Sequence, residues 1–142
     1  MKLCILNVKS PKAKTINKDL AGGYGTGTHI GKSLRAKVIE YLKKSGIKLP
    51  ILSAGYIAAI FHKAGHEVSY IENKLPDSAD LILIPTSIVD CKNEIEWAKK
   101  VKEALPGAKV GFFGAFSSAQ PKFYLPHCDF VIIGEPEASA EQ

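Results

Sequence analysis

The stretch GTGTHIGKS at residues 25–33 has the composition of a phosphate-binding loop, with glycines followed by a lysine and a serine. In nucleotide hydrolases the two glycines of this loop stand five positions apart, so that backbone N–H groups surround the phosphates and the lysine reaches the outer ones. The position five residues before Gly31 is Thr26, whereas Gly27 stands four residues before it and Gly25 six. The spacing therefore excludes a nucleotide hydrolase loop.

A dinucleotide-binding loop does not fit this segment either. Gly22 to Gly27 gives G-x-x-G-x-G, the reverse of the G-x-G-x-x-G spacing that such loops need, and Glu72 is the only approximation to the acidic residue expected at the end of a second strand. The segment from Lys9 to Lys32 is too long for a simple connection, and such segments are usually functional or disordered. Both interpretations stay open, because glycines let a backbone approach a large ligand closely.

The composition is that of a single globular domain. The chain has 142 residues, of which 46% are hydrophobic and 23% charged. It has no apolar run of about 18 residues, the length that a membrane span needs, and no signal-peptide pattern at its start, so we expect a cytoplasmic protein without a membrane partner.

Positive charge is concentrated in the first third of the chain. Residues 1–50 hold 11 Lys and Arg against 2 Asp and Glu, a net charge of +9, whereas residues 51–142 hold 8 against 12, a net charge of −4. Arg35 is the only arginine, and the lysines are scattered rather than interleaved with aromatic residues. This pattern favours a solvated lysine surface over a nucleic-acid partner.

Strands and helices alternate along the sequence. Apolar patterns predict strands at 2–8, 66–72, 79–87, 108–116 and 128–136, the last three apolar enough to be buried. Helical spacing predicts helices at 33–44, 51–64 and 91–105, and a short helical or turn segment at 117–127. The alternation predicts an α/β fold of the doubly wound, flavodoxin-like or Rossmann-like type, with a parallel five-stranded sheet and helices on both faces.

Ligands of such sheets bind at the carboxyl ends of the strands, so the loops that follow the strands are the places for chemistry. Four of these loops are rich in small polar residues, Gly or Pro: the segment 9–32, PTSIVD, GAFSSAQ and GEPEAS.

The order of these elements resembles the N-terminal cobalamin-binding domain of cobalamin-dependent radical SAM enzymes. That family shows Pro-hydrophobic-Gly-hydrophobic-Tyr-hydrophobic-Ala-Ala followed by Ala-Gly-His-Glu-Val, and the matching residues here are Pro50, Gly55, Tyr56, Ala58, Ala59 and Ala64 to Val68. Small hydroxyl residues after the third strand, a Gly-Ala turn after the fourth and a Gly-Glu pair after the fifth also match. The resemblance covers nearly the whole chain.

The resemblance implies that the carboxyl edge of the sheet holds the corrin ring of cobalamin, with the nucleotide tail of the cofactor in a groove beside the central strands. Small residues after the fourth strand would let the backbone lie against a flat ring, and hydroxyl groups after the third would bond the tail. The cofactor-binding residues expected on this basis are Tyr24, Gly25, Thr26, Gly27, Thr86, Ser87, Ile88, Gly114, Ala115, Phe116, Ser117, Gly134 and Glu135.

Two departures limit what the chain does by itself. The Asp-x-His-x-x-Gly motif that supplies a cobalt ligand in the methionine-synthase type is absent, since His29 has Gly27 in place of the Asp, so no metal-ligating residue is assigned. Cys4, Cys91 and Cys128 do not form the Cys-x-x-x-Cys-x-x-Cys motif of an iron–sulfur cluster. We therefore expect one cobalamin-binding domain over residues 1–142, a fragment or module that needs a radical SAM domain in cis or in trans, with its iron–sulfur cluster and S-adenosylmethionine. No catalytic residue is assigned to this chain.

Alternatives from two other classes are a flavodoxin-like or receiver-like domain and a small enzyme. A stand-alone flavodoxin-like domain would bind a flavin or another nucleotide-tailed ligand, with Tyr24, Trp97 and Phe116 as weak candidates for ring contacts. A phosphoryl-accepting receiver domain is disfavoured, because the first strand ends without an aspartate. A small enzyme with Cys91 as nucleophile ranks last, because no histidine lies near it in sequence to act as base.

Overall fold

A parallel sheet forms the centre of the molecule in the computed structural model, which describes residues 1–9, 18–19, 31–46 and 50–140. Within these ranges the sheet has five strands in the order β2-β1-β3-β4-β5. Their bounds are β1 Lys2–Asn7, β2 Glu67–Glu72, β3 Leu81–Pro85, β4 Lys109–Phe113 and β5 Phe130–Val131. The predicted doubly wound α/β fold is confirmed.

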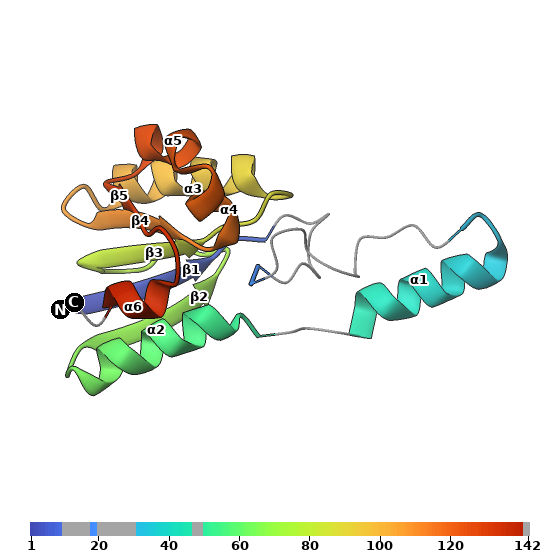
Figure 1. The fold of residues 1–142 in the computed structure, drawn as a ribbon, viewed down its shortest axis with the longest axis horizontal. Helices are drawn as coiled ribbons and strands as arrows, with labels where there is room; N and C mark the ends of the chain where they lie inside the picture. The colour runs from blue at the N-terminus through green and yellow to red at the C-terminus, as the bar shows by residue number, and fades with distance from the viewer. Residues whose placement is uncertain (10–17, 20–30, 47–49, 141–142) are drawn as a thin grey trace.

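Helices cover both faces of the sheet (Figure 1). On one face lie α2 (Leu52–Lys63) and α6 (Pro136–Ala140), and on the other α3 (Cys91–Ala104), α4 (Ala115–Ala119) and α5 (Pro121–Tyr124). A 3-10 turn at Leu125–His127 leads into β5. Helix α1 (Leu34–Gly46) stands apart from these layers in Figure 1, and apolar side chains such as Leu34 and Tyr41 are exposed on it.

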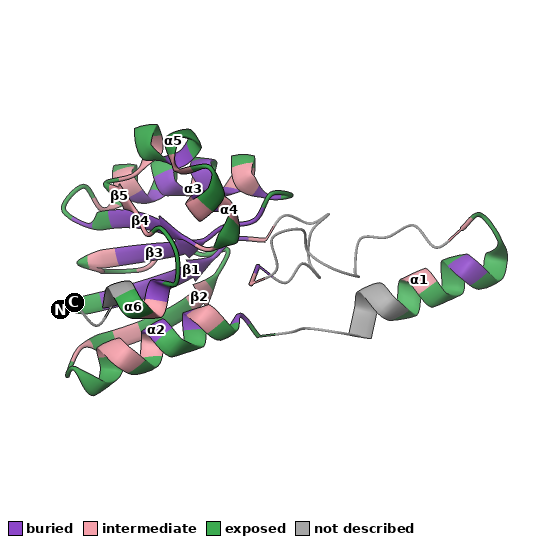
Figure 2. Cartoon of the chain, viewed as in Figure 1, coloured by how far each residue is buried: buried purple, intermediate pink, exposed green. Residues whose placement is uncertain are grey.

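Alternate residues of the central strands supply the two cores. In β1, Leu3 and Ile5 pack with the α2 side chains of one face. Cys4 and Leu6 point the other way and pack with α3. Side chains alternate across a strand, so a strand buried on both faces must be apolar at every position. The buried residues follow the central strands in Figure 2, which explains why these runs are continuously apolar in the sequence.

Two elements differ from the sequence-based prediction. The buried strand expected at 128–136 is reduced to Phe130–Val131, and both residues are half-buried, because β5 is an edge strand that pairs only with β4. The helix predicted at 51–64 is apolar on nearly all sides, yet α2 buries only Ala54 and Ile57 and leaves Tyr56 60% exposed. Tyr56 lines the cavity described below, which accounts for its exposure.

Gly111 in β4 allows β5 to lie against the sheet. A β-carbon at this position would stand 2.4 Å from two ring carbons of Phe130, well inside van der Waals contact. Gly111 is also paired with Phe130 in the strand register, and the ring of Phe130 fills the space that a side chain at position 111 would need. Because Gly111 has no side chain, β5 can pair with β4 at this position. The loop that follows β5 carries Gly134 and Glu135.

A pair of glycine-to-alanine substitutions tests this packing. Gly111→Ala should lower the free energy of unfolding by about 1–3 kcal/mol, because the ring of Phe130 must move. Gly55→Ala, in the middle of α2 with no atom within 4 Å of the added carbon, should instead raise it by about 1 kcal/mol. Urea unfolding followed by circular dichroism measures both, and equal effects of the two changes would contradict the assignment.

Candidate functional site

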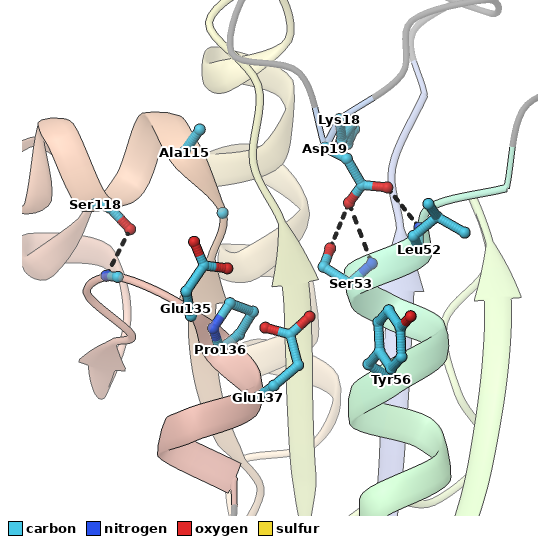
Figure 3. A pocket seen from close by; sticks show the side chains of 12 residues that line it. Lys18, Asp19, Leu52, Ser53, Tyr56, Ala115, Ser118, Glu135, Pro136 and Glu137 are labelled. Carbon is cyan, nitrogen blue, oxygen red and sulfur yellow. Dashed lines mark hydrogen bonds between the residues drawn. The ribbon is translucent and has the colours of Figure 1, made fainter.

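A cavity of about 370 Å³ opens at the carboxyl edge of the sheet (Figure 3). It lies between the N-terminus of α2 and the loops that follow β4 and β5. The strand order places β2 and β3 on opposite sides of β1, which makes this edge the topological switch point where α/β sheets bind ligands. We call it the edge cavity; it is lined by Lys18, Asp19, Leu52, Ser53, Tyr56, Gly114, Ala115, Ser118, Gly134, Glu135, Pro136 and Glu137.

Small residues form the wall contributed by the β4 and β5 loops. Gly114 and Gly134 have φ angles of 116° and 85°, values that residues with a side chain rarely adopt. The Ser118 hydroxyl accepts a hydrogen bond from the Gly134 N–H at 3.1 Å, which ties the two loops together. Gly114, Ala115 and Gly134 present backbone and a single methyl group to the cavity, and the rest of this wall is made by Ser118, Glu135, Pro136 and Glu137.

The opposite wall is the N-terminus of α2, and Asp19 caps it. Helix α2 has Ile51 at its N-cap position, which offers no side-chain acceptor. The Asp19 carboxylate takes this role from a distant part of the chain: Oδ2 accepts from the Leu52 N–H at 2.5 Å, and Oδ1 accepts from the Ser53 N–H at 3.3 Å and from its hydroxyl at 2.5 Å. These bonds are the dashed lines to Asp19 in Figure 3.

Lys18, the residue before Asp19, is buried in an ion pair with Glu94 of α3. The side chains are 2% and 0% exposed, and Nζ of Lys18 lies 2.7 Å from Oε1 of Glu94. The lysine also donates to the Pro85 carbonyl oxygen at 3.0 Å, at the end of β3. Lys18 therefore anchors its segment to α3 and to the end of β3, and the adjacent Asp19 anchors the same segment to the N-terminus of α2.

Glu94 collects further donors from two other elements. Oε1 accepts from the backbone N–H of Ser87 at 2.9 Å and from its hydroxyl at 3.1 Å, and Oε2 accepts from the Tyr124 hydroxyl at 2.9 Å. Burial raises the pKa of the Glu94 carboxyl, while the charge of Lys18 and these hydrogen bonds oppose the rise. Burial and the neighbouring Glu94 charge also raise the pKa of Tyr124, which keeps its hydroxyl protonated as a donor.

Four of the residues expected from the sequence lie together in the edge cavity: Gly114, Ala115, Gly134 and Glu135. Ile88 is exposed and Phe116 packs against Phe123 and Tyr124, so neither is among the residues that line the cavity. Tyr24, Gly25, Thr26 and Gly27 lie outside the described residues.

The hydroxyl residues expected to bond a ligand are buried behind the cavity wall. Thr86 donates to the Phe113 carbonyl oxygen at 2.9 Å and accepts from the Ser117 N–H at 3.1 Å. The Ser117 hydroxyl donates to the Gly114 carbonyl oxygen at 3.2 Å, and Ser87 bonds Glu94. In this structure Thr86, Ser87 and Ser117 fix the loops that carry the cavity wall.

Several residues that shape the cavity are not among those predicted from the sequence: Lys18, Asp19, Tyr56, Glu137 and, behind the wall, Glu94. One sequence feature points to Lys18 and Asp19: they form a charged pair shortly before the glycine-rich run. Charged side chains at the start of a long loop can fix the loop to the rest of the protein. Glu94 sits on the apolar face of α3 with Ile95, Ala98 and Val101, and a carboxylate on such a face must have a buried partner.

The edge cavity is rich in carboxylates. Asp19, Glu135 and Glu137 line it, and within the described ranges Lys18 is the one cation among the lining residues. Oε2 of Glu137 is buried and has no hydrogen-bond partner within the part of the chain that the structure describes. In that same part no group of three or more His, Cys, Asp or Glu residues could hold a metal ion.

Comparison with protein-family models gives no match, and comparison with curated proteins gives none either. None of the helices in the described ranges combines the length and the apolar character that crossing a membrane requires.

The buried ion pair gives a stability prediction. Glu94→Gln should lower the free energy of unfolding by about 3–5 kcal/mol, because it leaves the Lys18 ammonium buried without a counter-charge. The matched control is Glu96→Gln, two positions along α3 on its exposed side, which should change stability by less than about 0.5 kcal/mol.

The second arm combines Glu94→Gln with Lys18→Met. The double variant should recover part of the lost stability, since it removes the uncompensated charge. Urea unfolding of the natural chain, Glu94→Gln, Lys18→Met and the double variant measures the coupling. A double variant destabilised by the sum of the two single changes would show that the pair does not interact.

Proposed function

We propose that this chain binds cobalamin at the edge cavity and serves as the cofactor module of a radical SAM methyltransferase. The observation that carries the proposal is the position and lining of the cavity: it opens at the switch point of the sheet, and the loops after β4 and β5 contribute the small residues Gly114, Ala115 and Gly134 to its wall. These three residues are among the larger set that the sequence resemblance predicts to bind the cofactor.

The cavity suits one part of a large flat cofactor. Its volume of about 370 Å³ falls in the range of small-molecule sites, about 300–1,000 Å³, and takes one edge of a corrin or one of its substituents. The ring would then lie across the mouth, where glycine backbone allows close approach. Glu135 is exposed at this mouth, on the side where a catalytic domain would close over the ring.

In this proposal the cofactor and the chain have different roles. Bound cobalamin supplies the methyl-transfer chemistry, and the chain's residues orient the ring and shield one of its faces. The iron–sulfur cluster and S-adenosylmethionine belong to a radical SAM domain in cis or in trans.

A flavin-binding domain is the second candidate, and one observation favours it. The order β2-β1-β3-β4-β5 is that of flavodoxin-like folds, in which flavin mononucleotide binds at the β1/β3 switch point. The same edge would then hold an isoalloxazine ring instead of a corrin.

The first test is a visible absorption spectrum of the purified chain after incubation with hydroxocobalamin and gel filtration. We expect corrin bands to remain with the protein. Ala115→Trp, which fills the cavity from the β4 loop, should weaken binding by about tenfold or more, since it takes the space that the ligand needs. Ala119→Trp in the same short helix is the control, because Ala119 is exposed and is not among the lining residues.

The opposite result is equally clear. A chain that is folded by circular dichroism, passes hydroxocobalamin through the column and retains flavin mononucleotide would replace the cobalamin proposal with the flavin one. Binding of hydroxocobalamin that Ala115→Trp leaves unchanged would move the site away from the edge cavity.

A further inference from the structure

We propose that Asp19 is a specificity-determining residue of the edge cavity: its carboxylate occupies the N-terminus of α2 and so keeps phosphate groups of ligands out. This inference rests on the proposed function only in taking the edge cavity as the ligand site. It concerns which chemical groups the cavity accepts, and it disfavours flavin mononucleotide, the second candidate ligand, because that ligand carries a phosphate.

The N-terminus of a helix normally attracts anions. Its first N–H groups have no partner within the helix, and the helix dipole adds partial positive charge, so phosphates bind there in many α/β proteins. Helix α2 has 12 residues, follows β1 in the layered body and points its N-terminus into the edge cavity. A phosphorylated ligand would be expected to place its phosphate at this position.

Asp19 already fills that position. Its two carboxylate oxygens accept from the N–H groups of Leu52 and Ser53 and from the Ser53 hydroxyl. These are the donors that a phosphate would use, and the aspartate also brings the negative charge that the helix dipole favours. A ligand phosphate would have to displace it and would meet its charge.

The carboxylate is fixed in place by its neighbour. Lys18 is buried between Glu94 and the Pro85 carbonyl oxygen, so the chain on the N-terminal side of Asp19 is anchored in the protein interior. Displacing Asp19 from α2 would therefore strain a buried ion pair as well as uncap a helix. The Asp19 carboxylate is therefore a fixed part of the cavity wall.

The other charges on the described residues that line the cavity act in the same direction. Glu135 and Glu137 add two carboxylates, and the charge of Lys18 is already paired with Glu94. Oε2 of Glu137 has no hydrogen-bond partner among the described residues, so it can accept a hydrogen bond from a ligand. The group that fits here donates hydrogen bonds and carries no negative charge, as a carboxamide or an amine does.

The test measures binding of inorganic phosphate and of flavin mononucleotide by isothermal titration calorimetry. The natural chain should bind neither at the α2 terminus. Asp19→Gly should gain about tenfold or more in affinity for both, because the helix N–H groups become available and the repelling charge is gone. The control is Glu135→Gln, which removes a carboxylate from the cavity without touching the α2 terminus and should gain much less.

A second variant protects the test against misfolding. Asp19→Ser removes the charge and shortens the side chain while keeping an oxygen near the helix, so it should fold and still gain phosphate affinity. The proposal is overturned if folded Asp19 variants bind phosphate no better than the natural chain, or if Glu135→Gln gains as much as they do. Since no corrin takes part, failure of the cobalamin proposal would show only in the hydroxocobalamin experiment.

Discussion

The buried ion pair between Lys18 and Glu94 is the constraint on which the carboxyl edge depends. A charge removed from water is tolerated only when its partner and its hydrogen bonds are in place, so each group that contacts Glu94 has a fixed position. Through Ser87 the pair fixes the loop after β3, and through Tyr124 it fixes helix α5. Through Lys18 it holds the segment that carries Asp19.

The edge cavity follows from this arrangement. One wall is the capped terminus of α2, held by Asp19, and the other is made of the loops after β4 and β5, held by Ser118 and by the bonds among Thr86, Ser117 and Gly114. The hydroxyl groups that a ligand was expected to meet are used to build these walls. Among the described residues that line the cavity, three of the charged groups are carboxylates, those of Asp19, Glu135 and Glu137, and the charge of Lys18 is paired with Glu94.

The two proposals answer different questions about one place. The cobalamin proposal draws on the fold, the small residues of the β4 and β5 loops, and a resemblance in sequence. The Asp19 proposal draws only on contacts between described atoms. A corrin carries carboxamide groups around its rim and its phosphodiester in the tail, so a cavity that accepts donors and excludes phosphate would face the rim of the ring.

The sequence by itself determined the layered sheet and most of its elements. Continuous apolar runs at β1, β3 and β4 can exist only in strands covered on both faces, and the spacing of Ile95, Ala98 and Val101 requires a helix with one buried side. The sequence also placed four residues at the carboxyl edge, because loops that follow parallel strands meet there. These residues are Gly114, Ala115, Gly134 and Glu135.

Only the tertiary structure decided what those loops do. That Lys18 pairs with Glu94, 76 positions away, depends on the packing of α3 against the sheet, and no periodicity of the sequence encodes such a contact. No sequence periodicity encodes the capping of α2 by Asp19 either, which joins residues 33 positions apart. Nor does any encode the hydrogen bond between the hydroxyl groups of Thr86 and Ser117. Local patterns report which face of an element is buried; which polar group meets which depends on distances between elements that exist only once the chain has folded.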